Sequence, residues 1–86
     1  MNPVLPMVHL NGTSQKTLFE GYLKARDAVL DAMHAMNEVT FHSRDYYTIG
    51  NGAWPAAVSE RREEMAKLEH VYQYLSKHIE HIADQR

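Results

Sequence analysis

The sequence predicts an all-α fold, an antiparallel two-helix hairpin with an extended N-terminal arm that assembles into a helical-bundle oligomer. Two long stretches carry apolar residues three and four positions apart, a spacing that places them on one side of a helix. A single segment without this period joins the two stretches. The 86 residues include no cysteine, so disulfides are excluded and one chain buries little core. We therefore expect a second copy to supply the missing burial.

The N-terminal arm covers residues 1–12. Pro3 and Pro6 fix their own φ angles and donate no backbone hydrogen bond, and the residues around them are mostly apolar. The arm is therefore expected to be extended and to end at the turn dipeptide Asn11-Gly12.

The first helix is predicted over 14–37. Thr13 or Ser14 can cap it by accepting from a first-turn amide, and Asn37 can end it in a left-handed conformation. The expected seam against the second helix consists of Leu18, Tyr22, Ala25, Val29, Ala32 and Met36, and it is widened by Phe19, Leu23, Leu30 and Met33.

Residues 38–53 form a long connection, and the second helix is predicted over 55–83. Pro55 fits the first turn of that helix, where a missing amide costs nothing. The charged run 60–67 is interpreted as a solvated face. The expected seam consists of Val58, Met65, Leu68, Tyr72, Leu75, Ile79 and Ile82.

A further stripe beside this seam predicts self-association. Its members are Val71, Tyr74, His78 and His81. One partner helix cannot cover both the seam and the stripe, so we expect a homodimer or a larger closed oligomer. An antiparallel dimer would bring the arm of one chain beside the long connection of the other, so that a shared site would lie between subunits.

Charge and hydropathy exclude several classes of partner. The net charge is -2, with nine Lys and Arg against eleven Asp and Glu. This balance argues against a DNA-binding protein or a membrane-surface binder, and no apolar run is long enough to cross a bilayer. The N-terminal residues do not resemble a signal peptide, so the expected location is the cytoplasm.

The long connection contains the first half of a candidate ligand site, formed by Arg44, Asp45, Tyr46 and Tyr47. A guanidinium pairs with phosphate or carboxylate, and aromatic rings stack on bases. The alternative is a lid, in which Tyr46, Tyr47 and Trp54 fold over the end of the bundle and Arg44 pairs locally with Asp45. Both interpretations are open at this point.

The second half is the turn Asn11, Gly12, Thr13 and Ser14. Its small polar groups and free amides precede a helix, which is where anions bind readily. Helix capping by Thr13 or Ser14 is the alternative explanation of the same residues.

The sequence offers little for metal binding or catalysis. His78 and His81 share a face, but a zinc site needs three or four ligands, and neither a metal nor a cofactor is expected. No nucleophile with a base, carboxylate pair or phosphate-binding loop occurs at a convincing spacing, so we expect a protein without enzymatic activity.

The segments His9-Leu10-Asn11-Gly12-Thr13-Ser14 and Arg44-Asp45-Tyr46-Tyr47 resemble small helical proteins encoded by bacteriophages and prophages. This resemblance implies an accessory protein in the host cytoplasm, of the kind that includes oligomeric sponges for nucleotide immune signals. In such a site Arg44 would pair with phosphate, Tyr46 or Tyr47 would stack on a base, and Thr13 or Ser14 would hold a second anionic group. The alternative function is an adaptor that binds a host or virion protein without a small ligand.

Overall fold

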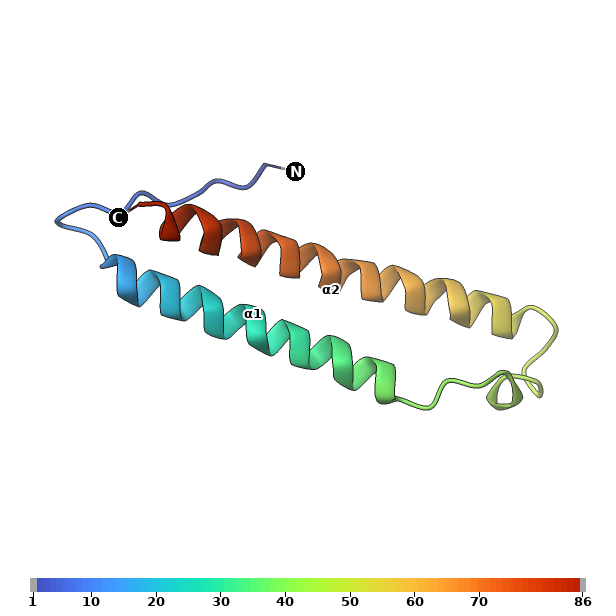
Figure 1. Ribbon diagram of the computed structural model, residues 1–86. Helices are drawn as coiled ribbons and strands as arrows, with labels where there is room; N and C mark the ends of the chain where they lie inside the picture. The colour runs from blue at the N-terminus through green and yellow to red at the C-terminus, as the bar shows by residue number, and fades with distance from the viewer. Residues whose placement is uncertain (1, 86) are drawn as a thin grey trace.

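The computed structural model describes residues 2–85, and within them the chain is a helical hairpin without strands. Helix α1 spans Gln15–Glu38 and helix α2 spans Ala53–Ala83. A single turn of 3-10 helix, η1 at Ser43–Asp45, lies in the connection. Figure 1 shows the two long helices side by side, with the N-terminal arm along the last turns of α2.

Helix α1 begins at the Ser14 cap and ends one residue later than predicted. The Ser14 Oγ accepts a hydrogen bond from the Thr17 amide at 3.2 Å. The predicted left-handed stop at Asn37 is wrong, because no residue other than glycine has a positive φ within 2–85. The helix ends instead at the β-branched Val39, whose backbone is extended and whose amide donates to the Met36 carbonyl.

Helix α2 begins at Ala53, two residues before Pro55. Gly52 is its N-terminal flanking residue and provides no side-chain cap. Pro55 is the third helical residue, where a backbone amide has no partner within the helix. The turn before it contains Gly50, whose φ of 146° is a conformation that side chains rarely adopt.

Two hydrogen bonds fix how the helices lie against each other. The Gln15 side-chain amide donates to the Ile82 carbonyl at 3.0 Å, joining the start of α1 to the end of α2. At the other end, Arg61 Nη2 donates to the Met36 carbonyl at 2.5 Å. The chain therefore reverses through the connection, as Figure 1 shows.

The seam on α1 differs from the predicted one at two positions. Ala25 and Ala32 are exposed, whereas Met33, which was expected to widen the seam, is half-buried, and so is Arg26, which was not predicted there. The Arg26 guanidinium lies 5.7 Å from the centre of the Tyr72 ring. A long charged side chain can cover apolar surface while its head stays in water, so arginine takes a position that the pattern assigned to alanine.

The arm covers part of the stripe that was predicted to meet a second copy. The Val8 amide donates to Gln85 Oε1 at 2.6 Å, and Gln85 Nε2 donates to the Pro6 carbonyl at 3.2 Å. His81 Nε2 lies 2.9 Å from the same carbonyl. The chain thus supplies its own cover for the His81 side of α2.

The buried core lies at one end of the hairpin. Its members are Leu75, His78, Ile79 and Ile82. These residues come from the last turns of α2, near the start of α1 and the arm. Elsewhere the described side chains between the helices are at most half-buried, so the hairpin is packed most tightly near its termini. No helix in the described part of the chain is both long and apolar enough to cross a membrane.

Candidate functional site

The turn Asn11–Ser14 is exposed, and its last residue, Ser14, caps the start of α1. The Gly12 amide donates to the His9 carbonyl at 3.1 Å. A Cβ on Gly12 would lie 2.6 Å from His9 Nε2, so the glycine allows the His9 ring to lie against the turn. The Ser14 hydroxyl, besides accepting from Thr17, lies 2.9 Å from the Thr17 hydroxyl. Capping thus accounts for Ser14, while Thr13 is exposed next to it.

The turn Arg44–Tyr47 is built on η1. His42 Nδ1 accepts from the Arg44 amide at 3.1 Å, and the Tyr46 amide donates to the Ser43 carbonyl at 2.9 Å. Within residues 2–85 no ion pair joins Arg44 to Asp45, and both side chains are exposed. The local Arg44 to Asp45 pair of the lid interpretation is therefore not formed.

An aromatic cluster closes the loop end of the hairpin. Phe41 lies 4.7 Å from Trp54 and 5.8 Å from Tyr46, measured between ring centroids, and Tyr46 lies 5.6 Å from Trp54. The Arg61 guanidinium lies 4.7 Å above the Phe41 ring. Tyr46 and Trp54 are therefore half-buried in this cluster, whereas Tyr47 does not join them and is 72% exposed.

Sequence reasoning missed Phe41 and Arg61 as parts of this end. Arg61 was placed in the solvated run, yet it follows Val58 by three residues and precedes Met65 by four, which is the spacing of the seam. That spacing was the signal that could have identified it. Phe41 lies in a segment without a period, so no pattern indicated its contact with Trp54.

The two halves of the candidate site do not meet within one chain. The molecule measures 61 × 23 × 17 Å, and the helices occupy its long axis. Asn11–Ser14 precedes the end of α1 that is bonded to Ile82, and Arg44–Tyr47 follows the end that is bonded to Arg61. A site made of both halves requires two copies of the chain.

His78 and His81 take part in packing. His78 is 2% exposed, and its ring contacts those of Tyr22 and Tyr74, with centroids 4.7 and 4.4 Å away. Its Nδ1 lies 2.9 Å from the Tyr74 carbonyl, which can only accept, so Nδ1 carries the proton. Within 2–85 no group of three or more His, Cys, Asp or Glu is arranged to hold a metal ion.

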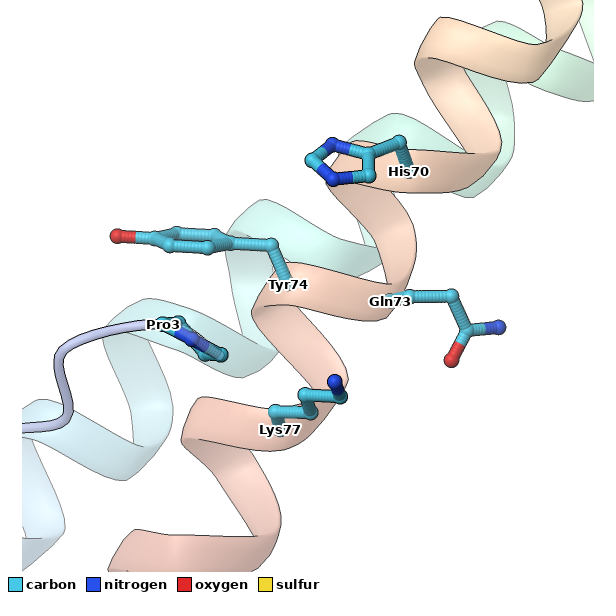
Figure 2. A pocket seen from close by; sticks show the side chains of 5 residues that line it. All are labelled: Pro3, His70, Gln73, Tyr74 and Lys77. Carbon is cyan, nitrogen blue, oxygen red and sulfur yellow. The ribbon is translucent and has the colours of Figure 1, made fainter. Parts of the chain in front are cut away.

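The described residues line several hollows that are open to solvent, and the one drawn in Figure 2 is small. It measures about 70 Å³ and lies between the arm and α2, lined by Pro3, His70, Gln73, Tyr74 and Lys77. Figure 2 shows that Tyr74 extends between His70 and Pro3, while Gln73 points to the other side of the helix. Sites for small molecules are typically roughly 300–1,000 Å³, so this hollow suits a few water molecules only.

One charged group on α2 has a shifted pKa. Lys67 Nζ donates to Glu64 Oε1 at 2.8 Å, and this hydrogen bond, with the charge of Glu64, raises the pKa of Lys67. Both side chains are exposed, so the pair adds little to stability.

No protein-family model matches the chain, and no curated protein or solved structure matches it.

Proposed function

We propose that this protein is a non-enzymatic binding protein that works as an oligomer of antiparallel helical hairpins. The observation that carries the proposal is surplus surface. The chain exposes 6564 Å², whereas a compact monomer of its 9.9 kDa exposes about 5,200 Å². Its radius of gyration is 18.5 Å, against about 12 Å for a compact chain of this length. The surplus of roughly 1,400 Å² is what one subunit of a stable homodimer buries.

The loop end supports a small anionic, nucleotide-like ligand. The Arg44 guanidinium makes no hydrogen bond or ion pair within residues 2–85, and the exposed Tyr47 ring is close to it in sequence. A guanidinium can pair with phosphate while a tyrosine ring stacks on a base. In the proposed oligomer, Asn11–Ser14 of another copy adds backbone amides at a helix start.

This arrangement agrees with the resemblance to phage accessory proteins. An oligomer with such sites would sequester a nucleotide signal of the host in the host cytoplasm. It requires neither catalysis nor a metal or other cofactor.

Thermal melting with a panel of cyclic and linear nucleotides tests the ligand. A nucleotide at 100 times its Kd should add about 2.7 kcal/mol to the free energy of unfolding. Arg44→Ala should remove the shift, and Arg62→Ala, an exposed arginine on α2, should keep it. If no nucleotide raises the melting temperature, the proposal of a nucleotide-like ligand is wrong. Sedimentation of the protein alone tests the oligomer separately.

A second function, an adaptor for a host or virion protein, is favoured by the arm. Val4, Met7 and Leu10 are 94%, 73% and 99% exposed and lie three residues apart. In an extended chain of the polyproline type, with three residues per turn, such residues share a face. An adaptor would lose its partner when all three become serine, and it would show no melting shift with nucleotides.

A further inference from the structure

Helix α1 carries an uncharged row of small residues that its own hairpin does not cover. The members are Gly21, Ala25, Ala28, Ala32 and Ala35, all exposed. They lie alternately four and three residues apart, so they follow one side of the helix. A Cβ added at Gly21 would meet nothing within 4 Å.

The first part of this row forms one wall of an apolar groove. The groove measures about 340 Å³ and is lined by Thr17, Leu18, Gly21, Tyr22 and Ala25 of α1 and by Leu75 of α2. It is open to solvent and contains no charged lining residue. The groove and the row together therefore form an uncharged surface on which a helix with small, uncharged side chains can pack closely.

We propose that a second copy of the chain supplies this cover, with its α1 packed antiparallel on the first α1 about a two-fold axis at Ala28. This inference rests on the proposed self-association and names its surface. Because the row is nearly symmetric about Ala28, Gly21 of one copy faces the partner's Ala35, and Ala25 lies near the partner's Ala32. Small side chains allow the helix axes to approach to about 8 Å.

Charge decides the direction of the pairing. Lys24 and Asp31 lie seven residues apart and so flank the row on the same side. Both are exposed, and neither forms an ion pair within residues 2–85. In the antiparallel arrangement Lys24 lies beside the partner's Asp31, twice in each dimer. In a parallel arrangement the two-fold axis runs along the helices, so Lys24 and the partner's Asp31 would lie on opposite sides of the interface and this attraction would be lost.

This interface also brings the two halves of the candidate site to the same end of the dimer. Antiparallel α1 helices place the start of one beside the end of the other. Asn11–Ser14 of one copy then lies at the end that carries the partner's Arg44. The same dimer would therefore bury part of the surplus surface and would also complete a site that one chain cannot form.

Charge reversal with sedimentation tests the pairing. Lys24→Glu and Asp31→Lys should each raise the dimer Kd by about tenfold, because two attractive pairs become repulsive. The double variant should return to the wild-type Kd, since both pairs are attractive again. Asp27→Lys, a reversal at an exposed position off the row, should leave the Kd unchanged. Single variants without effect, or a double variant that is not rescued, would overturn the interface.

A cysteine placed on the two-fold axis provides an independent readout. The chain has no cysteine, so Ala28→Cys introduces a single thiol that faces its own copy and should oxidise to a covalent dimer. His34→Cys, at an exposed position off the row, should stay monomeric on denaturing gels. A wild-type dimer that Ala28→Cys fails to cross-link contradicts the interface alone. A wild-type protein that is monomeric at high concentration contradicts both the interface and the proposed oligomer.

Discussion

The ring of His78 stacks on the ring of Tyr22, with centroids 4.7 Å apart and ring planes inclined by 28°. This contact joins α1 to α2 at the buried end of the hairpin. A histidine in this position behaves as a packing residue, since its polar Nδ1 is satisfied by the Tyr74 carbonyl one turn earlier. Stability at this end therefore depends on an aromatic contact as well as on aliphatic burial.

We expect His78→Ala to lower the free energy of unfolding by about 2–4 kcal/mol, because it leaves a cavity and removes two ring contacts. Chemical denaturation monitored by circular dichroism measures the loss. The control is His70→Ala on the same helix, where the side chain is exposed, and it should change stability by less than about 0.5 kcal/mol. Equal effects of the two variants would contradict the packing role of His78.

Arg61→Ala should destabilise the loop end. The variant leaves the Met36 carbonyl without its donor and removes the cation above the Phe41 ring, so we expect a loss of about 1–3 kcal/mol. Because Trp54 is the only tryptophan and contacts Phe41, its fluorescence should change as well. Arg62→Ala should leave the fluorescence unchanged. The same fluorescence change in both variants would contradict a specific role of Arg61 at the loop end.

Ser76 offers a test in which stability should rise. Its hydroxyl oxygen is buried and finds no hydrogen-bond partner among residues 2–85, which costs free energy in the folded state. Ser76→Ala should therefore stabilise the protein by about 1 kcal/mol. Ser59→Ala, at an exposed position of the same helix, gives the gain from helix propensity alone. The Ser76 variant should have the higher melting temperature of the two. The opposite order would contradict the claim that the buried Ser76 hydroxyl destabilises the fold.

Gln85→Ala should release the arm. The Gln85 side chain bonds the Val8 amide and the Pro6 carbonyl, so its removal costs about 1–2 kcal/mol locally. We expect faster hydrogen exchange at the Val8 amide with little change in the melting temperature. Gln73→Ala removes a hydrogen bond to Glu69 on the surface of α2 and should leave the exchange of Val8 unaffected. A Val8 amide that exchanges equally in both variants would show that the arm is held by other contacts.

Periodicity predicted the two helices because apolar spacing directly reflects which side of a helix is covered. The buried positions Leu75, Ile79 and Ile82 were identified in this way. Spacing could not show that Arg26 covers the seam with its stem, because the pattern treats arginine as a polar residue. The predicted end of the first helix at Asn37 was wrong for a different reason. Several residues near this point can end a helix, and the helix ends where the backbone becomes extended, at Val39.

Contacts between segments far apart in the sequence were beyond the reach of the pattern. Gln85 holds the arm through hydrogen bonds across more than seventy residues, and no local rule indicates that pairing. For the candidate site, the sequence predicted a cap at Thr13 or Ser14, and it predicted that the two halves of the site meet only between subunits. It could not show that Tyr46 enters the aromatic cluster while Tyr47 is exposed, because both have the same chemistry.

The position of the buried core divides the hairpin into parts that open at different cost. The four buried residues in the described part of the chain all lie between positions 75 and 82, so the turns of both helices near the loop have fewer buried contacts to lose. Local opening should thus begin at the loop and require more free energy toward the termini. The end that carries Arg44 is then the part best able to adjust its shape to the proposed ligand, while the buried core near the termini keeps the two helices together.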